Sequence, residues 1–122
     1  MALTSNNCHS DMDSIIIQTS AGTTADANLL TDTTGSVYTI VLDNRSGSSA
    51  NYIKLYDAKS ATHGTTDPVF CAEVAASGIC TIVCASGIVL GTALSVAASA
   101  AAGTGSGGAG PGGTFKYTIY GS

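Results

Sequence analysis

Histidine and cysteine are the first side chains to consider, because they carry much of protein catalysis and metal binding. The segment CHSDMD, from Cys8 to Asp13, packs four potential metal ligands into one short stretch. Adjacent Cys8 and His9 do not easily share one ion, and the paired spacing of a structural zinc site is missing. We interpret the segment as a solvated arm or an interface segment, with adventitious metal binding as the alternative.

Nucleophilic catalysis needs a cysteine or serine held by a histidine that is itself oriented. Besides His9, the only histidine is His63, in the loop ATHG, where a surface imidazole is ordinary. Glu73 is the only glutamate, and the aspartates fall mainly in turns, where they cap backbone groups. We therefore expect neither paired carboxylates nor a catalytic residue. A small hydrolase with a Cys–His pair is kept as a distant class of alternative.

The segment Gly103–Gly108 (GTGSGG) has the spacing GxGxxG, which in dinucleotide-binding folds seats a pyrophosphate on a helix N-terminus. Here a β-like run containing Pro111 follows, and no βαβ unit precedes it. We predict a flexible loop and no cofactor.

The segment from Asn51 to Asp57 alternates between polar and apolar residues, the period of a strand with one exposed face. It places Tyr52, Lys54 and Tyr56 together, opposite the aliphatic residues between them. Aromatic rings with a polar tip are enriched at interfaces. We predict that these three residues contact a partner protein or a glycan. The alternative is that they cover the outer face of an ordinary sheet.

The four cysteines are even in number, but no secretory signal precedes them, which favours free thiols. Cys80 and Cys84 on one strand would lie about 13 Å apart, too far to bridge. If Ser77 and Gly78 form a two-residue hairpin turn, Cys71 faces Cys84, and a disulfide between these two is the alternative.

Short β-branched or aromatic runs, separated by Gly- and Ser-rich turns, indicate strands throughout the chain. We predict a single all-β domain over residues 14–122, a two-sheet, jelly-roll-like β-sandwich, preceded by an extended arm over residues 1–13. The runs Val69–Ala75 and Ile79–Cys84 form either a hairpin or a pair of strands that switch sheets. The expected strands are Ser14–Thr19, Asn28–Thr31, Val37–Asp43, Asn51–Asp57, Val69–Ala75, Ile79–Cys84, Thr92–Ala102 and Thr114–Tyr120.

Composition limits the partners that this chain of 122 residues is suited to bind. Only 10% of the residues are charged, against about a quarter in typical soluble domains, and the formal net charge is -4. Nucleic-acid binding needs clustered cations. The chain has four lysines and arginines in all, so we expect it to bind no nucleic acid directly.

No apolar run is long enough to span a membrane, and we expect synthesis in a cytoplasm. Few large apolar side chains imply a thin core that burial against partner subunits would help to stabilise.

Two segments resemble small β-sandwich virion proteins of tailed bacteriophages. They are VYTIVLDNRSGSSANYIKLYDAKSATHGTTDPVF and VAASGICTIVCASGIVLGTALSVAAS. The resemblance rests on a strand like NYIKLYDA, followed by a loop, a proline and a glycine between apolar strands. It extends from Val37 to the C-terminus and leaves residues 1–36 unmatched.

The resemblance implies a role in a virion and carries over no catalytic residues. Of the roles that such proteins have, we favour a capsid decoration (cement) protein on the capsid exterior, assembled in the bacterial host cytoplasm. Its expected partners are the major capsid protein and copies of itself, as a homotrimer. The alternative is a tail, neck or fibre-associated module that contacts other virion proteins or host surface glycans.

Overall fold

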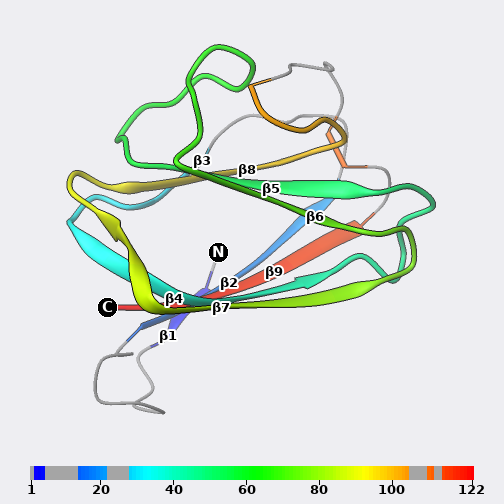
Figure 1. Cartoon of the computed structure of the whole chain (residues 1–122), viewed down its shortest axis with the longest axis horizontal. Coiled ribbons are helices and arrows are strands. Elements are labelled where there is room, and N and C mark those ends of the chain that lie inside the picture. Colours follow the sequence, from blue (N-terminus) through cyan, green and yellow to red (C-terminus); the bar gives the residue numbers. More distant parts are fainter. Residues whose placement is uncertain (1, 5–13, 22–27, 105–109, 112–113) are drawn as a thin grey trace.

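Two antiparallel sheets face each other in the computed structural model, which describes residues 2–4, 14–21, 28–104, 110–111 and 114–122 (Figure 1). These residues form strands, turns and loops, with no helix among them. The all-β class and the two-sheet sandwich are thus confirmed. The strands are β1 (Ala2–Thr4), β2 (Ser14–Ala21), β3 (Asn28–Thr31), β4 (Gly35–Asp43), β5 (Asn51–Tyr56), β6 (Phe70–Val74), β7 (Ile79–Leu90), β8 (Leu94–Ser99) and β9 (Thr114–Gly121).

The strand order is nested. The five-stranded sheet has the order β1-β2-β9-β4-β7, and the four-stranded sheet has the order β3-β8-β5-β6. Strand β2 pairs with β9, β3 with β8, β4 with β7 and β5 with β6, all antiparallel. The chain is therefore arranged like one long hairpin that has been rolled into two layers.

Alternation along the strands builds the core between the sheets. Ile40 of β4 lies opposite Ile119 of β9, and Leu42 lies opposite Tyr117, and all four side chains are buried. The four-stranded sheet contributes the buried side chains of Ile53, Leu55 and Val96, among others. Successive strand residues point to opposite faces, so this register leaves the residues between them on the outer faces.

Two strands differ from the expected pattern. Ala2–Thr4, inside the predicted arm, forms β1 and pairs with β2, while residues 1 and 5–13 lie outside the described part. Strand β7 runs on to Leu90, although the expected strand ended at Cys84. It does so through a bulge, in which the register with β4 shifts and Gly87 adopts a φ of 77°. Glycine tolerates this left-handed conformation, so the strand bends there and continues.

Strands β6 and β7 lie in different sheets, so the alternative of sheet-switching strands is confirmed and the hairpin is wrong. Ser77 has a φ of 57°, and the N–H of Gly78 donates to the carbonyl of Ala75. The chain turns here from the four-stranded to the five-stranded sheet. Cys71 consequently lies opposite Lys54 in the register, and the disulfide to Cys84, which was the alternative to free thiols, is not formed. The thiols of Cys71, Cys80 and Cys84 are free.

A buried asparagine fixes this change of sheet. The Asn44 side chain is fully buried, and its Nδ2 donates to the carbonyls of Ser49 and Ala75, both at 2.9 Å. Its Oδ1 accepts a hydrogen bond of 2.7 Å from Nδ2 of buried Asn51. The backbone N–H of Asn44 donates to the carbonyl of Gly78. One side chain thus links the β4–β5 connection to the β6–β7 turn.

Candidate functional site

The predicted Tyr-Lys-Tyr face is covered, which corrects the expectation of an exposed strip. The structure confirms the alternation, because Ile53 and Leu55 enter the core between the sheets. However, Lys54 and Tyr56 are each exposed by 1% or less, and only Tyr52 keeps a half-buried side chain. Lys54 and Tyr56 therefore cannot reach a partner while their cover is in place.

The cover is the loop between β5 and β6, which arches over the outer side of the four-stranded sheet (Figure 1). His63 of this loop places its Nε2 at 3.2 Å from Nζ of Lys54, and the carbonyl of Ala58 accepts a 2.6 Å bond from Oγ of Ser95. The loop returns to β6 with the N–H of Val69 donating to Leu55. Burial under this loop lowers the pKa of the Lys54 amine.

The two tyrosines of this face have different surroundings. The negative charge of Glu73, which lies opposite on β6, is the main cause of a raised pKa at Tyr52, and burial adds to it. At Tyr56, by contrast, burial is the main cause of the raised pKa. The Tyr56 Oη atom is buried, with no hydrogen-bond partner in the described part of the chain. These are the surroundings of an enclosed polar layer between a sheet and a loop.

The residues considered for catalysis and metal binding do not form a site within the described ranges. The ring of His63 contacts Lys54, with Nε2 at 3.2 Å from Nζ. Within these ranges no three His, Cys, Asp or Glu side chains are grouped so that they could hold a metal ion. The segment Cys8–Asp13 and most of the glycine motif, residues 105–108, lie outside the described residues.

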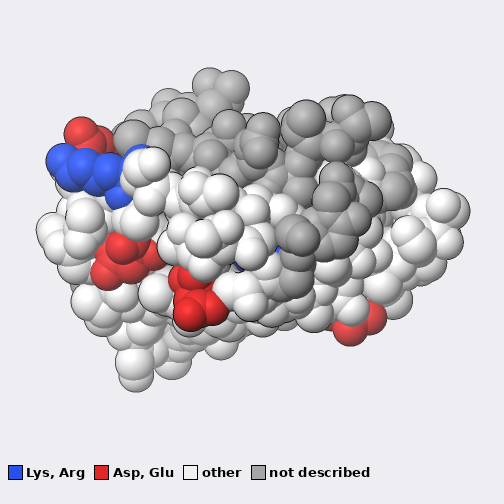
Figure 2. All heavy atoms as spheres, turned by 90° about the horizontal axis from the view of Figure 1, so that it is seen from above, with Lys and Arg blue, Asp and Glu red and all other residues white. Residues whose placement is uncertain are grey.

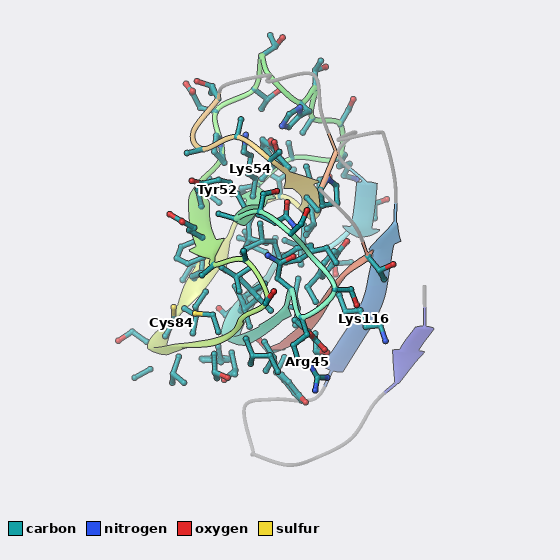
Figure 3. All side chains as sticks on the ribbon, turned by 90° about the vertical axis from the view of Figure 1, so that its right-hand side faces the viewer. Arg45, Tyr52, Lys54, Cys84 and Lys116 are labelled. Atoms are coloured by element: carbon teal, nitrogen blue, oxygen red, sulfur yellow. The ribbon has the colours of Figure 1, made fainter. Side chains whose placement is uncertain are left out.

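A small polar hollow lies where β4 ends and β9 begins. It has a volume of about 280 Å³ and is lined by Asp43, Arg45, Ser46, Thr114 and Lys116. Arg45 Nη2 lies 2.8 Å from Asp43 Oδ2, and its Nε lies 3.1 Å from Oδ1. This hydrogen-bonded pairing with Arg45 lowers the pKa of Asp43 to about 2. Figure 3 shows Arg45 and Lys116 on the same side of the molecule. The Asp43 carboxylate neutralises Arg45, and Lys116 is the second cation that lines the hollow.

No described segment crosses the outer face of the five-stranded sheet (Figure 1). Two rows of its residues run across β7, β4 and β9 in register and carry no charge. Lys116 and Asp43 appear only in the next row, beside the polar hollow. The uncharged rows are Val83–Thr39–Tyr120 and Thr81–Val41–Thr118. Such a face is suited to contact with another protein, because it loses little charge hydration on burial.

Exposed aliphatic side chains gather on β7, at the edge of this sheet. Ile79, Val83 and Val89 are all more than half exposed, and Val83 is exposed by 71%. The sequence reasoning missed these residues and singled out the strand on the opposite sheet instead. The sequence does contain a signal for such an uncharged strand, because no charged residue lies between Glu73 and Lys116. A strand in that stretch has no charged side chain to mark its exposed face.

Charged groups are sparse on the loop side of the molecule as well. Figure 2 shows this side, where uncharged atoms dominate the described surface and blue gathers in one corner. Lys59 forms an exposed ion pair of 2.6 Å with Asp32. This surface offers no band of cations.

Comparisons with known proteins leave the chain without a family assignment. No family model, no curated protein and no solved structure matches it. No helix of the described residues could span a membrane.

Proposed function

We propose that this protein is a non-catalytic structural subunit that binds other protein subunits through the outer face of its five-stranded sheet. The main observation in support of this proposal is the uncharged surface made by the two rows across β7, β4 and β9. Exposed Ile79 and Val83 lie at its edge. The buried centres of protein interfaces are depleted of charged residues, and this surface has that composition.

We further propose that the nested strand pairing is that of a jelly roll and that the setting is a phage virion. Jelly rolls pair eight strands in two sheets and occur in viral capsid and lectin domains. Strands β2 to β9 are eight strands in two sheets, and they pair in the nested order described above. The fold alone does not define a function, so the virion setting rests on the sequence resemblance from Val37 onward.

Within a virion, a capsid decoration protein is the role that we favour, bound to the outer surface of the major capsid protein lattice. Burial of the uncharged face against the lattice would stabilise neighbouring capsid subunits by linkage. The tail, neck or fibre role is the alternative. Its glycan-binding form loses support, because Lys54 and Tyr56 are covered.

A binding experiment with matched variants tests the proposal. Purified protein is added to particles that lack it, and the bound amount is measured by co-sedimentation. Thr118→Lys places a charge in the middle of the uncharged face, and Thr65→Lys places the same charge on the exposed loop over the other sheet. We expect Thr118→Lys to lose binding and Thr65→Lys to bind like the wild type, because only the first buries an unpaired charge.

Heat resistance is the functional readout of the same experiment. Particles loaded with wild type or Thr65→Lys should withstand a higher temperature than particles without the protein. Equal binding of both variants would refute the proposed face, and binding without any gain in heat resistance would refute the decoration role.

A further inference from the structure

Strand β7 has one paired and one unpaired side. Its inner neighbour is β4, and no described strand lies on its other side, since β7 ends the sheet. From Ile79 to Val83 the register with β4 runs without a break, and the bulge comes only after Val83. These five residues thus form a regular edge, and alternate residues along it direct their backbone N–H and C=O groups away from β4, toward the place of another strand.

This edge lacks most of the features that protect edge strands from pairing. Proteins shield such edges with lysine, proline, bulges or a very short strand. β7 is 12 residues long and contains neither a charged residue nor a proline. Its one protective feature, the bulge, lies beyond the segment Ile79–Val83. The side chains exposed there, Ile79, Thr81 and Val83, are apolar or uncharged.

We propose that the Ile79–Val83 segment of β7 pairs antiparallel with the same segment of a second copy, about a two-fold axis at Thr81. In this register Ile79 of each copy lies opposite Val83 of the other, and Thr81 lies opposite itself. The two copies then join their sheets edge to edge in a closed, symmetric pair.

The segment is suited to a second copy because it is its own complement. Aliphatic residues meet aliphatic residues at both ends, and the central Thr–Thr pair is a favourable cross-strand combination. No charge meets a like charge, although each chain carries a net charge of -4, because the stretch between Glu73 and Lys116 is uncharged. Asp43, the nearest charge in the register, is on β4 and is separated from the other copy by β7.

The pair would also enlarge the face proposed above. A two-fold axis between antiparallel edge strands stands perpendicular to the sheet, so both uncharged faces point the same way. This consequence rests on the proposed function, whereas the pairing itself does not. The predicted two-fold pair also differs from the homotrimer that the resemblance implies.

Sedimentation equilibrium on the full chain tests the pairing. Val83→Lys puts a cation on the edge segment, and Val69→Lys puts one at a similarly exposed valine, 53% exposed, outside β7. We expect the wild type and Val69→Lys to dimerise, and Val83→Lys to raise the dimer dissociation constant at least about tenfold. Ile79→Lys should act like Val83→Lys, and a far-ultraviolet circular dichroism spectrum like that of the wild type verifies the fold of each variant.

Hydrogen exchange locates the contact. Amides of residues 79–83 should exchange more slowly as wild-type concentration rises, and this slowing should vanish in Val83→Lys. A wild type that stays monomeric up to about 1 mM refutes the pairing. A dimer or trimer that Val83→Lys leaves intact also refutes it. If the wild type is monomeric and Thr118→Lys still loses binding to particles, the self-pairing is refuted and the proposed function stands without it.

Discussion

Lys54 shows how far a residue's surroundings follow from local sequence. The alternation around it correctly predicts that Lys54 points away from Ile53 and Leu55. Its exposure depends on a loop that returns over the strand and brings His63 to 3.2 Å. Strand periodicity contains no information on the path of that loop, so the direction of the side chain was predictable and its burial was not.

Amine labelling tests the burial of Lys54. When the native protein reacts with an acylating reagent, we expect modification of exposed Lys59 and Lys116 and none of Lys54, which is 0% exposed. Peptide mass spectrometry after proteolysis gives the extent at each lysine. In denaturant all three should react. Native labelling of Lys54 at the rate of Lys59 would show that its side chain is accessible.

Asn44 is the residue on which the crossing between the sheets depends most. Asn44→Ala removes three strong side-chain bonds and leaves the buried Nδ2 of Asn51 without this acceptor. We expect the free energy of unfolding to fall by about 1–3 kcal/mol, the usual effect of unsatisfied buried polar groups. Urea denaturation measures it. Ser46→Ala, at an exposed neighbour, should change little, and equal stability of both variants would contradict the role of Asn44.

The side chain of Asp57 stabilises the turn between strands β7 and β8. Its carboxylate accepts hydrogen bonds from the backbone N–H groups of Gly91, Thr92 and Ala93, at 2.9, 2.8 and 3.2 Å. These bonds, led by that of Gly91, lower the pKa of Asp57. Because the folded state favours the ionised form, the stabilisation is present above the ordinary pKa and is lost as the pH falls through it toward the lowered value.

The pH dependence of unfolding tests this turn. Between about pH 6 and about pH 3 the Tm of the wild type should fall more than that of Asp57→Asn, which lacks the titrating group. Asp67→Asn removes an exposed carboxylate elsewhere in the chain and should follow the wild-type curve. Parallel curves for the wild type and Asp57→Asn would contradict the link between Asp57 and the turn.

The separation of β6 and β7 into different sheets sets the state of the cysteines. Alkylation in denaturant without a reductant should modify Cys71, Cys80 and Cys84, because their thiols are free. Peptide mapping identifies each modified residue. A linked Cys71–Cys84 peptide from the freshly purified protein would instead support the hairpin that the structure lacks.

Most strands were predictable because turn residues and β-branched runs are local signals. Val37–Asp43 and Thr114–Tyr120 were correctly expected as strands, and each is one residue or two short of the observed bounds. The extension of β7 beyond Gly87 was not predictable. A glycine that ends a strand and a glycine that forms a bulge give the same signal in the sequence. Strand order depends on long-range pairing and was not predictable at all.

At the scale of the whole molecule, the distribution of charge separates the two outer faces. The four-stranded sheet carries its polar residues beneath a loop, whereas no described segment covers the two uncharged rows of the five-stranded sheet. Composition had indicated burial against partner chains, since only 10% of the residues are charged. It did not indicate which face, because that depends on where the β5–β6 loop lies.

The copy number of the protein in purified virions tests the proposed role most directly. A decoration protein occupies a site repeated over the whole capsid lattice, so quantitative mass spectrometry against the major capsid protein should give on the order of hundreds of copies per particle. Single figures or low tens would contradict the decoration role and support the tail or neck. Absence from particles would contradict the virion setting altogether.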